Sequence, residues 1–182
     1  MDFSFKGYGN ISSLLKFSSI VLIFLAQLFY GKAGMTLWKM AAACTILTDY
    51  LLLFTNYYEL GVLFFIVVHL MRYIERNRIN NKKFPYYALI LAIGVYFITI
   101  IFESKLIALS LTYALFLFLN TIEAFNSKDK KLILAYILFC ACDLSVGIAN
   151  IESSVISSVF RDLIWVFYLP SQILLSNEII DI

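Results

Sequence analysis

The chain has 182 residues, of which 62% are hydrophobic and 17% aromatic, whereas only 14% are charged. A soluble domain of this length carries about 25% charged residues, and the mean hydropathy here is +0.89. This composition excludes an ordinary soluble globular domain and predicts a membrane protein. The net charge of +2 favours neither nucleic acid nor an acidic protein as a partner.

Hydropathy predicts seven apolar segments, each of about the 20 residues that a helix needs to cross a bilayer. They are Ile11 to Tyr30, Met35 to Phe54, Tyr57 to Ile74, Phe84 to Phe102, Leu106 to Ile122, Leu132 to Asn150 and Ser157 to Ser176. The fifth is the shortest, and we expect it to extend toward Phe125. Since no Pro-, Gly- or Ser-rich linker divides residues 1–182, we predict an all-α, polytopic membrane helix bundle with about seven transmembrane helices in one domain.

Basic residues predict the orientation of this bundle. No small-residue cleavage site directly follows the first segment, so we expect it to be retained. With seven spans, nine Lys and Arg residues fall on one side and four on the other, which predicts an outside N-terminus and a cytoplasmic C-terminus in a bacterial inner membrane. The larger set is Lys32, Arg72, Arg76, Arg78, Lys82, Lys83, Lys128, Lys130 and Lys131, and the smaller is Lys6, Lys16, Lys105 and Arg161. The basic loop 72–83 serves as a topology determinant and is also able to hold anionic lipid head groups.

Two acidic residues, Asp49 and Asp143, stand inside apolar segments. An ionised carboxylate at mid-bilayer costs at least a few kcal/mol, so both should face the bundle interior or a wet cavity. Counting a rise of about 1.5 Å per residue places both in a central slab together with His69 and Tyr168. Gln172 lies four residues after Tyr168 and therefore on the same helical face.

Two carboxyls in one cavity do not both ionise easily, so one would keep its proton and act as a general acid beside the other. The alternative is that each Asp only ties helices together by hydrogen bonding. We expect no metal and no cofactor, because the three cysteines lie in apolar segments and the chain has a single His. Lys16 is expected to snorkel at the outer interface, and Asn120 and Glu123 to end the fifth span at an interface.

Several short motifs on successive segments resemble the YhhN-like lysoplasmalogenase family. The family has a Gly-Asp step, a Gly-Phe-His pattern and a Ser-Asp step on successive spans. The corresponding residues here are Thr48–Leu52, Gly61–Phe65 with His69, Phe139–Asp143, Tyr168 with Gln172, and Lys16 in place of the Lys of a Lys-Pro step. The chain departs from the family at Thr48, Cys142 and Phe17, where Gly, Ser and Pro are usual, and has seven spans where eight are typical.

The resemblance implies hydrolysis of the vinyl ether bond of lysoplasmalogens, with a lysophospholipid substrate drawn from the membrane. It implies that Asp49 and Asp143 are catalytic, and that His69, Tyr168 and Gln172 position substrate or water. The residues leave two other functions open. One is a small carrier coupled to protons or cations, and the other is a non-catalytic lipid-binding bundle. They leave the oligomeric state open as well.

Overall fold

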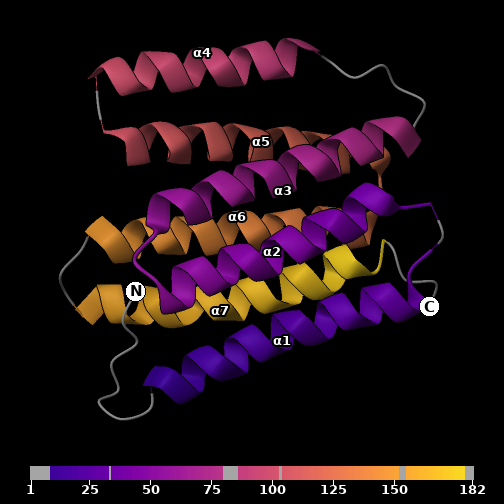
Figure 1. Ribbon diagram of the computed structural model, residues 1–182, viewed down its shortest axis with the longest axis horizontal. Helices are drawn as coiled ribbons and strands as arrows, with labels where there is room; N and C mark the ends of the chain where they lie inside the picture. The colour runs from indigo at the N-terminus through magenta and orange to yellow at the C-terminus, as the bar shows by residue number, and fades with distance from the viewer. Residues whose placement is uncertain (1–8, 33, 80–85, 103, 152–154, 179–182) are drawn as a thin grey trace. The chain divides into compact units, whose positions relative to one another are not determined.

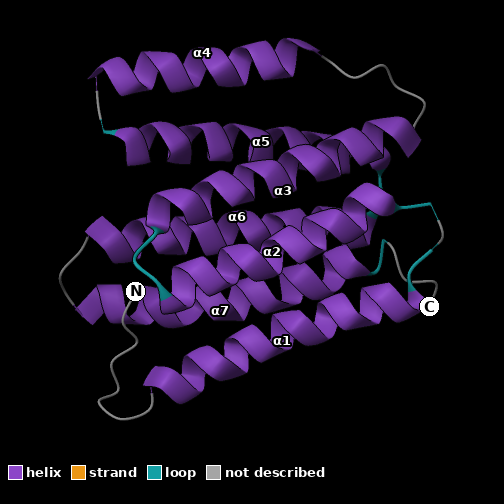
Figure 2. Ribbon diagram, viewed as in Figure 1, coloured by secondary structure: helices purple, strands orange, loops and turns teal. Residues whose placement is uncertain are grey.

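The computed structural model describes residues 9–32, 34–79, 86–102, 104–151 and 155–178, and these residues are helical apart from short connections (Figure 1, Figure 2). The helices are α1 (Gly9–Tyr30), α2 (Thr36–Phe54), α3 (Tyr58–Ile79), α4 (Tyr86–Phe102), α5 (Lys105–Ser127), α6 (Lys130–Ile151) and α7 (Val155–Ser176). Each covers one predicted apolar segment, so the prediction of an all-helical fold is confirmed. α5 also continues past Phe125, as expected.

Four of these helices are long and apolar enough to cross a membrane. The candidate spans are Ser13–Tyr30, Thr36–Phe54, Lys105–Ser127 and Lys130–Asn150. Large apolar side chains are exposed along them, among them Leu22, Phe29 and Leu144. An exposed apolar surface of this kind is unusual in soluble proteins and suits contact with lipid.

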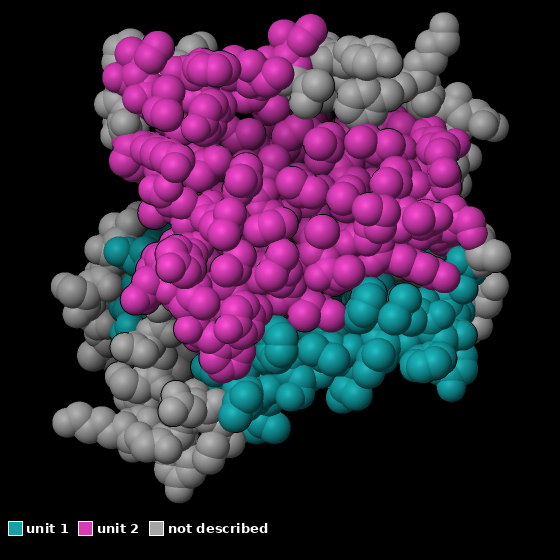
Figure 3. All heavy atoms as spheres, in the orientation of Figure 1, with its two compact units in different colours: residues 1–32, 123–182 teal, residues 33–122 magenta. Residues whose placement is uncertain are grey.

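The chain divides into two compact units, coloured separately in Figure 3. Unit 1 comprises residues 1–32 and 123–182, and unit 2 comprises residues 33–122. Unit 1 therefore contains α1, α6 and α7, and unit 2 contains α2, α3, α4 and most of α5. Of the basic residues used to predict the orientation, Lys6, Lys82 and Lys83 lie outside the described residues.

Within unit 2, α2 and α3 form an antiparallel pair whose register is fixed at both ends. The Arg78 guanidinium donates a hydrogen bond of 2.7 Å to the carbonyl of Gly34, in a turn where Gly34 has a φ of +88° that favours glycine. At the other end, Gly61 lies against Leu52. A Cβ atom built on Gly61 would be 2.6 Å from Leu52 Cδ2, so a larger residue at this position would require the Leu52 side chain to move.

Within unit 1, α6 and α7 form a second antiparallel pair. α6 begins after Asp129, whose carboxylate accepts hydrogen bonds from the backbone N–H groups of Lys131 (2.8 Å) and Leu132 (3.3 Å) and so caps the helix. The two helices contact each other at Phe139 and Tyr168, whose ring centroids are 5.8 Å apart. A long hydrogen bond from Ser157 to the carbonyl of Ala149 joins their other ends.

Candidate functional site

Asp49 lies on the buried face of α2 in unit 2. Its side chain is 5% exposed, and the same face carries Thr45 and Thr48, which are also buried. The two threonine hydroxyls donate to carbonyls of their own helix, Ala41 (2.9 Å) and Cys44 (2.8 Å). The expectation that Asp49 faces inward is therefore confirmed, and its immediate neighbours along the helix are neutral polar groups in a low-dielectric setting.

His69 is fully buried on α3 and is held by α5. Its ring packs edge-on against Tyr113, with centroids 5.2 Å apart, and lies near Phe65 at 6.5 Å. Its backbone carbonyl accepts a hydrogen bond of 2.9 Å from the side-chain amide of Asn120, which also donates to the carbonyl of Phe116 at 2.9 Å. The imidazole therefore packs among aromatic rings, and the hydrogen bond from Asn120 fixes the backbone of α3 at this residue.

The buried position of Asn120 corrects the expectation that this residue lies at a membrane interface. Its side chain is completely buried, because α5 continues to Ser127 and places Asn120 in the packed part of the helix. A buried amide is tolerated there because both of its donated hydrogen bonds end on carbonyl groups. Glu123, predicted to be interfacial with it, is partly buried.

The register of α2 and α3 sets the levels of Asp49 and His69. Leu52 and Gly61 lie side by side, and the two helices run in opposite directions. At a rise of about 1.5 Å per residue, Asp49 lies about 4 Å and His69 about 12 Å from that level, in the same direction. The two side chains therefore differ by about 8 Å along the pair of helices, or about one and a half turns.

The C-terminal half of α3 carries a buried row of charged residues that the sequence analysis assigned to a loop. Arg72 (3% exposed), Glu75 (0%) and Arg76 (6%) lie in the core, because α3 continues to Ile79 and does not end near Ile74. The Arg72 guanidinium lies 5.6 Å from the ring centre of Trp38 on α2, and Glu75 forms an ion pair of 2.5 Å with Arg78.

A signal for this row was available in the sequence. His69, Arg72 and Arg76 are separated by three and four residues, which places them on one helical face. A hydropathy window averages over all faces of a helix. It therefore assigns a helical segment with several charged residues to a loop, and it does not detect that these residues share one face.

Unit 1 holds the other three predicted site residues. Tyr168 and Gln172 are each 4% exposed on α7, and Tyr168 packs edge-on against Trp165 at 5.0 Å between centroids. Pro170 lies between them inside the helix and has no N–H to donate to the carbonyl four residues earlier. The Tyr168 carbonyl accepts a hydrogen bond of 2.6 Å from the Ser171 hydroxyl. The predicted polar face of this helix is therefore buried.

Asp143 is only partly buried on α6. The contact of Phe139 with Tyr168 sets the register of α6 and α7, so Asp143 lies about 6 Å from the level of Tyr168 along the helices. Gln172 lies on the opposite side of that level, about 12 Å from Asp143 along the axis. Within unit 1, Tyr168 is therefore the nearer of the two α7 residues to the carboxyl.

Lys16 on α1 contacts α7 as well. Its ammonium group lies 5.0 Å from the ring centre of Trp165, a cation–π distance, and its side chain is half-buried. The sequence analysis placed Lys16 at the outer interface and did not foresee this aromatic partner. Trp165 thus links the lysine of the family resemblance to Tyr168.

The five predicted site residues are divided between the two units. Unit 2 carries Asp49 and His69, and unit 1 carries Asp143, Tyr168 and Gln172. Each unit thus contributes one of the two predicted catalytic carboxyls, accompanied by a ring able to donate or accept a hydrogen bond. Comparison of the chain with models of protein families, with curated proteins and with solved structures found no match.

Proposed function

We propose that this chain is a multi-pass membrane hydrolase that cleaves the vinyl ether bond of lysoplasmalogens. The observation that carries the proposal is the burial of Asp49, a carboxyl 5% exposed on a helix apolar enough to span a membrane. A carboxyl shielded from water inside an apolar helix suits the role of a general acid. The family resemblance supplies the substrate class.

Vinyl ether hydrolysis needs little more than such an acid. Proton transfer to the β-carbon of the vinyl ether gives an oxocarbenium ion, and water adds to this ion to form a hemiacetal. The hemiacetal then collapses to a fatty aldehyde and a glycerophospho-alcohol, and the acid recovers its proton from the water. The second carboxyl, as an anion, would stabilise the positive charge of the oxocarbenium ion.

In this mechanism Asp49 and Asp143 serve as acid and anion, in either order. His69 and Tyr168 position water or substrate, and Gln172 binds near the head group. His69, Tyr168 and Gln172 are all buried, which supports roles inside the protein and away from bulk water.

The test uses purified protein in detergent with two substrates, a lysoplasmalogen and an acyl lysophospholipid. We expect aldehyde from the first and no fatty acid from the second. Asp49→Asn and Asp143→Asn should each lower aldehyde release to a small residual rate while the protein stays folded. Asp162→Asn is the matched control, because Asp162 is exposed on α7. Full activity in either of the first two variants would remove that carboxyl from the mechanism.

A second measurement asks whether the two carboxyls act as a unit. If both serve one reaction, the Asp49→Asn/Asp143→Asn double variant should lose no more activity than the worse single variant, because residues that act together are strongly non-additive. Losses that multiply would indicate two independent structural effects.

Seven transmembrane helices in a bacterial inner membrane, with the N-terminus outside and the C-terminus in the cytoplasm, complete the proposal. Support comes from the helices that cover all seven apolar segments and from the distribution of basic residues, which still favours the same side by seven to four when the buried Arg72 and Arg76 are left out. Reporter fusions placed after Phe54 and after Ser127 should report opposite sides of the membrane. The same side for both would contradict the proposed topology.

The buried charged row of α3 favours a second candidate, a proton- or cation-coupled carrier. Ionisable side chains inside membrane helices often mark ion pathways, and Arg72, Glu75 and Arg76 are all buried. Reconstitution of the purified protein into liposomes, with ion flux measured across the membrane, separates the two functions. Ion flux without aldehyde release would favour the carrier, and aldehyde release without flux would favour the hydrolase.

A further inference from the structure

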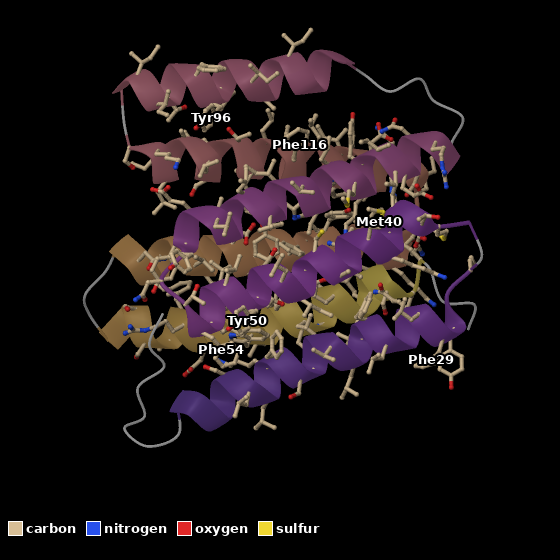
Figure 4. All side chains as sticks on the ribbon, in the orientation of Figure 1. Phe29, Met40, Tyr50, Phe54, Tyr96 and Phe116 are labelled. Atoms are coloured by element: carbon tan, nitrogen blue, oxygen red, sulfur yellow. The ribbon has the colours of Figure 1, made fainter. Side chains whose placement is uncertain are left out.

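Unit 2 contains a cavity of about 780 Å³ between α3, α4 and α5, and it is open to the surface along much of its length. Its inner wall is apolar and includes Leu63, Ile66 and Leu70 of α3 and Phe116 of α5. Tyr96 belongs to the wall formed by α4, and Figure 4 labels it together with Phe116. The volume falls within the range of about 300–1,000 Å³ that is usual for small-molecule sites.

One end of this cavity is charged. Glu59, in the first turn of α3, and Lys105, the first residue of α5, both line it and form an ion pair of 2.9 Å. The two side chains are 49% and 58% exposed, so both are available to solvent and to a ligand. Asn56 and Tyr57 add polar groups at the same end. The cavity therefore has a mouth with one positive and one negative charge above an apolar interior.

The depth of the cavity matches one leaflet of a bilayer. From Glu59 to Leu70 on α3, and from Lys105 to Phe116 on α5, the helices rise by eleven residues, or about 16 Å. The hydrocarbon core of a bilayer is about 30 Å thick, so half of it is about 15 Å. An extended alkyl chain from one leaflet would fill the apolar part and keep its polar end at the charged mouth.

We propose that this cavity binds a single-chain lipid with a zwitterionic head group. The alkyl chain would lie between α3, α4 and α5, with the anionic part of the head group at Lys105 and the cationic part at Glu59. Charge complementarity selects the head group, and the volume and depth select a single chain. This site is separate from the proposed catalytic residues, because none of the five lines the cavity.

The experiment uses purified full-length protein in a maltoside detergent and an alkylphosphocholine with a photoreactive diazirine near its methyl end. This probe has no vinyl ether, so its binding does not depend on hydrolysis. After irradiation and digestion, we expect the label on peptides containing Leu70 or Phe116. Label confined to peptides outside α3, α4 and α5 would overturn the proposal, and so would competition by a two-chain phosphatidylcholine as strong as that by the unlabelled single-chain lipid.

A pair of matched variants tests the cavity itself. Leu63→Trp fills it from a side chain that is 44% exposed, and Leu47→Trp makes the same change at a side chain on α2 that is 41% exposed and does not line the cavity. The first should weaken binding by at least about tenfold, since excluding two methylene groups already corresponds to this factor. Equal labelling of the two variants would contradict the proposal. Asp49→Asn should leave labelling unchanged, which separates this site from the proposed hydrolase.

Head-group charge provides a second, directional test. Alkyl sulfate and alkyltrimethylammonium with the same chain length compete against the zwitterionic probe. Glu59→Gln should shift the preference toward the sulfate because Lys105 remains, and Lys105→Gln should shift it toward the ammonium because Glu59 remains. An order of preference that neither variant changes would overturn the assignment of the head group to this ion pair.

Discussion

Replacing Gly61 by alanine tests the close approach of α2 and α3 that places Asp49. The new Cβ would lie 2.6 Å from Leu52 Cδ2 and 2.9 Å from its Cγ, where ordinary contacts begin at 3.4 Å. Leu52 would have to move by about 0.8 Å, and overpacking of this kind costs about 1–3 kcal/mol. We expect Gly61→Ala to lower the free energy of unfolding by that amount. It should also reduce aldehyde release, because Asp49 lies three residues from Leu52 on the same helix.

The assay is unfolding in mixed micelles by increasing SDS, followed by circular dichroism. Gly147→Ala is the matched control, because a Cβ there meets nothing within 4 Å and alanine is the better helix former. The double variant Gly61→Ala/Leu52→Ala removes the Leu52 Cδ2 and Cγ atoms that the new Cβ would meet. It should be less destabilised than the sum of its two single variants. Stability equal to wild type in Gly61→Ala, or additive losses in the double variant, would refute the reasoning.

Three further substitutions, two of them with a matched control variant, test polar contacts by the same unfolding assay. Asn120→Ala should lower the free energy of unfolding by about 1–3 kcal/mol, because it removes a buried amide and both of its hydrogen bonds. Asn150→Ala is the control, because the amide of Asn150 is exposed, and it should change the free energy of unfolding by no more than about 0.5 kcal/mol. Glu75→Gln removes a fully buried carboxylate and should destabilise more than Glu59→Gln, whose half-exposed ion pair contributes about 0–1 kcal/mol. Asp129→Ala should cost about 0.5–2 kcal/mol through loss of the α6 cap. An equal effect within either pair, or none at Asp129, would contradict the corresponding contact.

Hydropathy predicted the helices well, because the segments are continuous apolar runs that end where polar residues begin. The segment predicted to run from Met35 to Phe54 is α2, Thr36–Phe54, and the last segment ends at Ser176, as α7 does. Errors of a few residues occur where a helix continues into polar sequence. α3 runs on from Ile74 to Ile79 because its charged side chains find partners within the protein, which no average over a window can detect.

The inward faces of Asp49 and Tyr168 were also predictable, since a carboxyl or a phenol on an apolar helix avoids lipid. The burial of Asn120 was not, because it depends on a carbonyl of His69, a residue 51 positions earlier in the chain. Helical spacing says which side chains share a face, but it does not say which neighbouring helix that face meets. For this reason the sequence indicates that Asp49 and Asp143 lie at similar depths, and that they share one cavity stays a prediction.

The cavity of unit 2 belongs to the same class of feature. Its lining consists of ordinary apolar residues such as Leu63 and Phe116, which hydropathy assigns to lipid contact or to packing without distinguishing the two. Those side chains line a cavity only because of the spacing between three helices. Glu59 and Lys105 lie at the same end of it because α3 and α5 run in the same direction. The Glu59–Lys105 ion pair lies at the mouth of this apolar cavity. Because the pair is about half-exposed, it contributes only about 0–1 kcal/mol to the free energy of unfolding. The competition test with Glu59→Gln and Lys105→Gln therefore measures a role of the pair in binding that a stability measurement would not detect.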